Sequence, residues 1–229
     1  MTSDKSLVSG DSAGFLQKVF AWMFFGMLLS AGSAFFVLSD PTALSLVLGN
    51  DLVYYGLVLF ELALVIGLAW LSKRLPYPLV ALMFIIYSIT TGMTLSIIVL
   101  ANTTASIILV FVITSGIFAA MSVYGFVTKR DLSGIGMIMF MLLIGIVLAG
   151  IVNIFLNSSM LSFITSVIGV IIFTVLTAYD VQRIRSIGDS SDFSGEDLNK
   201  LAVRGALSLY LDYINLFLEL LSLFGKRRN

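Results

Sequence analysis

The chain has 229 residues, of which 59% are hydrophobic and 11% are charged, and its mean hydropathy is +1.07. Soluble domains carry roughly 45–50% apolar and about 25% charged residues, so this composition excludes an ordinary soluble protein and indicates an integral membrane protein. Thirteen basic and thirteen acidic residues balance and give no sign of a nucleic-acid partner, while the lack of Cys and His excludes disulfides, thiolate sites and histidine metal sites.

Seven apolar runs are long enough to cross a bilayer, because a helical span needs roughly 20 mainly apolar residues. They cover 19–38, 52–71, 79–100, 105–127, 134–156, 161–182 and 201–224. The first run is longer than the apolar part of a signal peptide, about 7–15 residues, so we interpret it as a retained span. The expected fold is an all-α integral membrane protein with seven transmembrane helices. We expect a polar tail over 1–18, a seven-helix domain over 19–224 and a basic tail over 225–229.

The connections between these runs are short, apart from one polar segment at 183–200 that is rich in Ser, Gly and Asp. We predict a loop there. No internal repeat is visible, so the sequence gives no support to a transporter built from inverted repeats.

Lys and Arg gather in the amino-terminal tail and in every second connection, where loops tend to remain cytoplasmic. This predicts a cytoplasmic amino terminus. Seven crossings then place Lys226, Arg227 and Arg228 on the opposite face. Either this tail lies outside after a full crossing, or the last segment re-enters the membrane and leaves by the same face. The last run has no Pro and no Gly between Gly205 and Gly225, which favours a full crossing.

The last apolar run carries polar residues three and four positions apart, which form a single stripe on a helix. They are Gly205, Ser208, Asp212, Asn215, Glu219 and Ser222. Helix packing through hydrogen bonds and small residues accounts for the serines and for Asn215. It accounts poorly for Asp212, because an acid at mid-membrane costs about 2.5–3.5 kcal/mol even on lenient scales, and such a residue is functional by default.

Two more acids lie within spans. Glu61 is near the middle of the second run, and Asp180 is near the end of the sixth, one turn before Arg183. For Asp180 the alternative is a headgroup-level pair with Arg183 or Lys73. Glu219 lies roughly 10 Å beyond Asp212 along the helix, near the outer interface, where hydration alone is an alternative.

The stretches "AYDVQRI" in the sixth span and "GALSLYLDYINLFLELL" in the seventh resemble the transmembrane Bax inhibitor motif family in a bacterial form, as do "TKRDLSGIG" and "MFIIYSITTGMTLS". The resemblance implies seven helices with the seventh enclosed by the other six, in a bacterial inner membrane. It also implies a pH-sensitive calcium leak channel gated by protonation of an intramembrane aspartate pair. Carried over by position, the pair is Asp180 and Asp212, which would hold calcium in transit, and the second-span acid is Glu61.

The same resemblance implies a basic latch residue at the end of the second span that pairs with the sixth-span aspartate. Ser72 stands where the first basic residue is expected, and Lys73 and Arg74 follow it. The latch candidates are therefore Arg74, Lys73 and Arg183. An accessory polar path would use Glu61, Asn215, Glu219 and Ser208.

General physical chemistry also predicts how such an aspartate pair would behave, independently of the family resemblance. Two carboxylates close together at low dielectric cannot both ionise cheaply, so they titrate as a unit and sense pH without histidine. Calcium prefers oxygen ligands and takes six to eight of them in a full site, so passage is favoured over tight storage. We expect no resident cofactor, with calcium as the permeating ion and the lipid bilayer as the main partner.

Three other functions compete with the leak. Tyr179 and Asp180, followed by Asp212, resemble the arrangement of intramembrane aspartyl proteases, but that class has Gly-x-Gly-Asp where this chain has "LYLD", and its Pro-Ala-Leu element is missing. We therefore expect no enzyme activity. The second competing function is that of an interaction protein that modulates a membrane quality-control protease. Such a protein would act through the tail at 1–14 or the segment at 183–200. A proton-coupled transporter that uses the same acids is the third.

Overall fold

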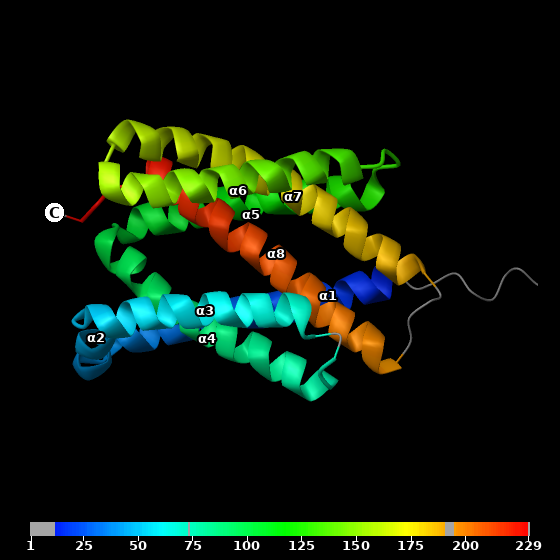
Figure 1. Cartoon of the computed structure of the whole chain (residues 1–229), viewed down its shortest axis with the longest axis horizontal. Helices are drawn as coiled ribbons and strands as arrows, with labels where there is room; N and C mark the ends of the chain where they lie inside the picture. Colours follow the sequence, from blue (N-terminus) through cyan, green and yellow to red (C-terminus); the bar gives the residue numbers. More distant parts are fainter. Residues whose placement is uncertain (1–11, 73, 191–194, 229) are drawn as a thin grey trace, which may run out of the picture. The chain divides into compact units, whose positions relative to one another are not determined.

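The protein is almost entirely helical in the computed structural model, which describes residues 12–72, 74–190 and 195–228 (Figure 1). Its helices are α1 (Ser12–Ser39), α2 (Pro41–Leu48), α3 (Asp51–Trp70), α4 (Tyr77–Ala101), α5 (Thr104–Val127), α6 (Ser133–Leu156), α7 (Ser159–Asp189) and α8 (Gly195–Phe224). All except α2 are long and apolar enough to cross a membrane. Within the described ranges there is no strand, only an isolated bridge between Asn102 and Arg227. The predicted all-α class with seven spans is confirmed.

The polar tail predicted over 1–18 overlaps α1, which begins at Ser12, and residues 1–11 lie outside the described residues. The domain boundaries otherwise stay predictions.

The short helix α2 was not predicted from the sequence. Its first turn is capped by Asp40, whose Oδ1 accepts the backbone N–H of Thr42 at 2.7 Å, and Pro41 occupies the first helical position. Both features favour a helix start, because Asp accepts otherwise unpaired N–H groups and Pro lacks one. This helix ends at Leu48 and is capped by Gly49, just before α3 begins.

The segment at 183–200, predicted as a loop, is mostly helical. α7 continues to Asp189 and α8 begins at Gly195, while residues 191–194 lie outside the described residues. Charged pairs one turn apart support these extensions. Arg185 lies 3.6 Å from Asp189, and Lys200 lies 2.8 Å from Asp197, which also suits the positive end of the α8 dipole. The loop prediction was wrong because the segment was judged by composition and not by this pairing.

The chain divides into two compact units. The first unit comprises residues 1–101 and 184–207, and the second comprises 102–183 and 208–229, so α7 and α8 each contribute to both. In the first unit α4 packs against α1 and α3. Ser30 and Ser33 of α1 donate to the carbonyl oxygens of Ser88 and Ile89 on α4, at 2.6 and 2.9 Å. These contacts join two apolar helices through small polar residues, as is common in membrane proteins.

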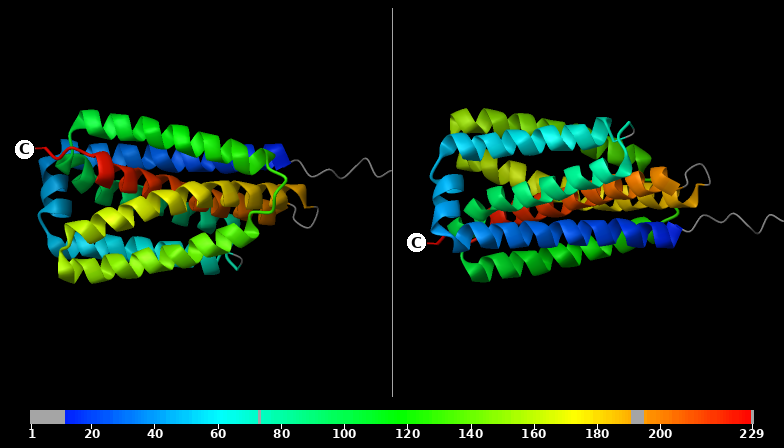
Figure 2. Two further views of the ribbon diagram at one scale, coloured as in Figure 1. Left: turned by 90° about the horizontal axis from the view of Figure 1, so that it is seen from above. Right: turned by 90° about the horizontal axis from the view of Figure 1, so that it is seen from below.

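The second unit is built from α5, α6, α7 up to Arg183 and α8 from Ser208. α6 and α7 run antiparallel side by side (Figure 2). α6 is capped at its carboxyl end by Asn157, which takes a left-handed conformation with φ 46°. Close approach of α5 to α7 depends on Gly125, where a Cβ would lie 2.2 Å from the carbonyl oxygen of Ala178. α8 is tied to its neighbours by a hydrogen bond between the hydroxyls of Tyr213 and Ser115 and by another between those of Ser166 and Ser222.

The carboxyl tail is fixed at the start of α5. Thr103 N donates to the carbonyl of Lys226 at 2.9 Å, and Lys226 N donates to Ser106 Oγ at 3.0 Å. α8 is one unbroken helix of 30 residues. It therefore runs from Ser208, beside the last turns of α7, to the opposite end of the second unit. This geometry agrees with a full crossing by the last span and not with a re-entrant segment.

Candidate functional site

A cavity of about 820 Å³ lies within the second unit and collects most of the polar residues singled out in the sequence. Its walls come from α6, α7 and α8. The predicted site residues that line it are Asp180, Arg183, Ser208, Asp212, Asn215 and Glu219. The stripe on α8 thus faces one continuous space for most of its length.

Asp212 is the most deeply placed acid of this cavity. The residue is only 4% exposed, and its Oδ2 accepts no hydrogen bond from any described residue. The neighbouring Leu209 and Leu216 are fully buried. α8 has 50% of its most apolar stretch buried inside the protein, the largest share of the seven candidate spans. A buried carboxylate oxygen without a partner is costly, so its presence calls for a ligand or a proton.

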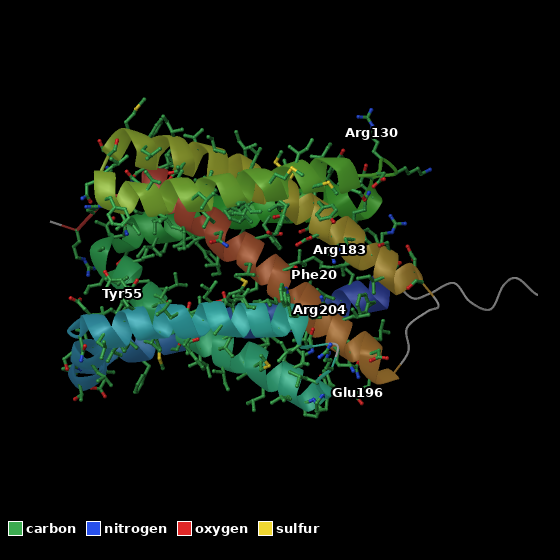
Figure 3. The ribbon with its side chains drawn as sticks, viewed as in Figure 1. Phe20, Tyr55, Arg130, Arg183, Glu196 and Arg204 are labelled. Atoms are coloured by element: carbon green, nitrogen blue, oxygen red, sulfur yellow. The ribbon has the colours of Figure 1, made fainter. Side chains whose placement is uncertain are left out.

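Asp180 lies on α7 within electrostatic range of Asp212. Ser208 of α8 donates a hydrogen bond to its carboxylate, and the positive charge of Arg183, one turn further along α7, acts on it electrostatically. Figure 3 labels the Arg183 side chain on α7. The sequence-predicted pair is therefore brought together in one cavity, with one hydroxyl and one guanidinium beside it.

The three latch candidates have different positions. Arg183 lines the cavity next to Asp180. Arg74 is exposed in the α3–α4 connection of the first unit, where its backbone N–H donates to Leu71 O at 2.8 Å, and Lys73 lies outside the described residues. Ser72, which stands at the expected latch position, is fully buried, and its hydroxyl has no described hydrogen-bond partner. Of the three, only Arg183 is placed beside the pair by contacts within one unit.

The turn of α7 that carries Asp180 is held from several sides. The Cβ position of Gly136 on α6 would lie 2.5 Å from the ring of Tyr179, so this glycine lets the ring pack on the α6 backbone. The Gln182 side chain donates to Arg130 O at 2.7 Å and accepts from Leu132 N at 2.9 Å, which fastens the α5–α6 connection to α7. The residues on either side of Asp180 are thus held by contacts with α6 and with the α5–α6 connection.

Glu219 occupies the other end of the cavity. It is half-buried, it accepts a hydrogen bond from Ser166 of α7, and its carboxylate rests against Gly169, where a Cβ would lie 2.8 Å from the carboxyl carbon. Asn215 lies between Glu219 and Asp212 and donates to Leu211 O at 2.8 Å. Glu219 is therefore supported by the protein, and hydration alone does not describe it.

Glu61 belongs to the first unit and is not part of this cavity. On α3 it accepts hydrogen bonds from Thr94 at 3.0 Å and from Thr91 at 3.4 Å, both on α4. The two threonines are buried. Both carboxylate oxygens of Glu61 therefore have described donors, which distinguishes it from Asp212.

A family model described as inhibitor of apoptosis-promoting Bax1 matches residues 12–229. The chain belongs to this Bax inhibitor family. It is 45% identical over 215 residues to the inner membrane protein YbhL of Escherichia coli K12, which covers 93% of this chain and 92% of YbhL. An uncharacterised protein of Borreliella burgdorferi is 41% identical over 215 residues, 94% of this chain and 93% of that protein. An uncharacterised membrane protein of Streptococcus pyogenes serotype M1 is 38% identical over 214 residues, 93% of this chain and 92% of that protein.

Membership of the Bax inhibitor family confirms the resemblance seen in the sequence. Together with the seven apolar helices it makes the chain a multi-pass membrane protein. The side on which the amino terminus lies stays a prediction.

Within the described ranges no group of three or more Asp and Glu residues is placed to hold a metal ion. Asp180 and Asp212 supply fewer oxygens than the six to eight that calcium takes in a full site.

Several residues of the site were missed by sequence reasoning. Gln182 was quoted in a motif but given no role, and the threonine donors to Glu61 were not paired with it. Thr91 and Thr94 are three positions apart and so share a face of α4, a signal that was available. Gly136 and Gly169 had no readable signal, because their role depends on which helices approach them.

Proposed function

We propose that this Bax inhibitor family protein is a pH-sensitive calcium leak channel in which Asp180 and Asp212 form the gate. When they share a proton the path is closed, and when the proton leaves, the two carboxylates attract calcium into the cavity of the second unit. Calcium is the permeating ion, and the protein contributes carboxylate and hydroxyl oxygens along its path.

The observation that supports this proposal most directly is the burial of Asp212 without a described hydrogen-bond donor to its Oδ2. Its residue is 4% exposed, its Oδ2 has no described donor, and it lines the same cavity as Asp180. An acid kept for packing alone would be expected to have its oxygens hydrogen-bonded, because the alternative costs about 1–3 kcal/mol for each unsatisfied group. Proton binding and cation binding both satisfy that oxygen, so the two compete for one site.

The test is calcium flux into liposomes that hold the purified protein, measured against pH. We expect flux to change steeply between about pH 6 and 8, a range that isolated aspartates with a pKa near 4 do not reach. Asp212→Asn should lower the flux at least about tenfold and remove its pH dependence, and Asp180→Asn should flatten the pH response while leaving some flux. Asp51→Asn, at the exposed start of α3, is the control and should behave as wild type.

The latch is tested in the same assay. Arg183→Ala should raise flux at the pH where the wild type is closed, since Arg183 is the basic residue placed beside Asp180. If Arg74→Ala raises it and Arg183→Ala does not, Arg74 is the latch.

The alternatives are outcomes of this experiment. Calcium movement only in exchange for protons would make the protein a proton-coupled transporter. No calcium movement at any pH would leave the modulator of a membrane protease as the better proposal. By its similarity to YbhL, we further propose a bacterial inner membrane as the location.

A further inference from the structure

The acids of the cavity lie at two levels. Asp212 and Glu219 are seven residues apart on α8, so they share a face and are separated by roughly 10 Å along the helix axis. Asp180, with its hydrogen-bond donor Ser208, lies at the same end of the cavity as Asp212. Ser166 donates a hydrogen bond to Glu219 at the other end. The cavity thus has two polar ends joined by a longer middle section.

The middle section is mainly apolar. Phe140, Leu143 and Ile146 of α6 line it, and Asn215 of α8 is a polar exception. A calcium ion with its ligands at 2.3–2.6 Å fills a sphere only about 5 Å across. The cavity volume of about 820 Å³ is much larger than such a sphere, so a single ion does not account for its size.

Acidic residues outnumber basic residues in the lining of the cavity. Asp180, Asp212 and Glu219 face it from α7 and α8, and Arg183 is its only cationic lining residue among those described. Arg183 stands next to Asp180, which leaves Asp212 and Glu219 as the acids that a ligand would meet. Asp212 Oδ2 is buried and unpartnered, and Glu219 is held in place against Gly169. Both ends therefore present an oxygen that can accept from an ammonium group.

We infer that this cavity binds a linear organic dication, an alkane chain with an ammonium group at each end. One ammonium group pairs with Asp212 and the other with Glu219, while the methylene chain lies along Phe140, Leu143 and Ile146. This inference concerns the same cavity as the proposed channel but does not depend on conduction, because it is a statement about binding.

The test is isothermal titration of the full-length protein, in nanodiscs of zwitterionic lipid, with diaminoalkanes of increasing length. An extended chain advances about 1.2 Å per bond, so a span of roughly 10 Å is bridged by about seven or eight methylene groups. We expect affinity to peak at that length. At the peak the diamine should bind on the order of tenfold more tightly than the monoamine of equal length, since it makes a second charge-assisted hydrogen bond.

Variants at each end locate the two contacts. Asp212→Asn and Glu219→Gln should each reduce the diamine to the affinity of the monoamine and remove the length optimum. Gly169→Ala, which places a Cβ against the Glu219 carboxylate, should weaken the diamine and leave the monoamine unchanged. Glu196→Gln is the matched control, because Glu196 lies on α8 but belongs to the first unit and does not line the cavity (Figure 3).

Affinity that does not vary with chain length would overturn the inference, and so would a length optimum that survives Glu219→Gln. The outcome is separable from that of the flux assay. A length optimum with no calcium flux leaves the binding site standing and removes the channel. Calcium flux that depends on Asp212, without any optimum of diamine length, would support the channel and overturn the binding site.

Discussion

Glu61 in the first unit and Asp212 in the second are both acids in the apolar part of a span, but their surroundings differ. Glu61 receives hydrogen bonds from Thr91 and Thr94, three positions apart on α4. Asp212 is only 4% exposed and has an oxygen with no described donor. The first acid is satisfied by the protein, and the second is left to a proton or a ligand. The sequence position of an acid in a span is therefore less informative than the number of donors that the fold brings to it.

The largest expected effect on stability is at the contact between α5 and α7 in the second unit. Gly125→Val should destabilise the protein by about 3 kcal/mol or more, because its Cβ would lie 2.2 Å from the carbonyl oxygen of Ala178 and force α5 away from α7. Gly116→Val, on the same helix with nothing within 4 Å of its Cβ position, is the control. Unfolding in mixed micelles with rising SDS measures both. Equal stability of the two variants would show that the close approach of α5 to α7 at Gly125 does not contribute to the stability of the fold.

The two acids themselves should respond with opposite signs. Asp212→Asn should raise the free energy of unfolding by about 1–3 kcal/mol, because it removes a costly intramembrane carboxylate. Glu61→Gln should lower it by about 1 kcal/mol, because one of its two accepting oxygens becomes a donor. The same SDS titration serves. A loss of stability in both variants would mean that Asp212 is as well satisfied as Glu61, and the contrast between the two regions would fail.

Gln182 tests how firmly the turn that carries Asp180 is held. Gln182→Leu removes the hydrogen bonds to Arg130 O and Leu132 N and should cost about 1–2 kcal/mol. Gln17→Leu, at an exposed position of α1, is the matched control and should cost almost nothing. If Gln182 is a positioning residue, its variant should also shift the pH profile of the flux. An unchanged profile would limit Gln182 to a structural role.

The smallest effect is expected outside the spans, at the exposed Asp131. Hydrogen bonds from the side chain and backbone of Ser133 lower the pKa of Asp131. A lowered pKa in the folded state stabilises the fold above the unfolded pKa, and this gain is lost as pH falls through the folded pKa. Thermal stability of Asp131→Asn should therefore fall slightly below wild type at neutral pH and converge with it below about pH 4. A difference that persists at low pH would rule out the carboxylate charge as the cause.

The sequence was sufficient to predict the seven spans and the stripe on α8, because both depend on local composition and helical periodicity. Asp212 and Asp180 were singled out as acids within apolar spans, their pairing came from the family resemblance, and both line one cavity in the structure. The helical extensions around 183–200 were missed, since the polar residues there were judged without their pairing partners. The support of Glu219 by Ser166 and Gly169 could not be predicted, because it depends on how α7 packs against α8.

The attachment of the carboxyl tail has a practical consequence for reporter fusions. Such fusions are commonly used to determine which face of a membrane a terminus occupies, and they are often joined directly to the last helix. Here the backbone of Lys226 is hydrogen-bonded to Thr103 and Ser106. A folded reporter joined directly after Gly225 would have to fit against the start of α5 and would disturb these bonds. A reporter joined after Arg228 through a flexible Gly/Ser linker keeps them, and should report the native face.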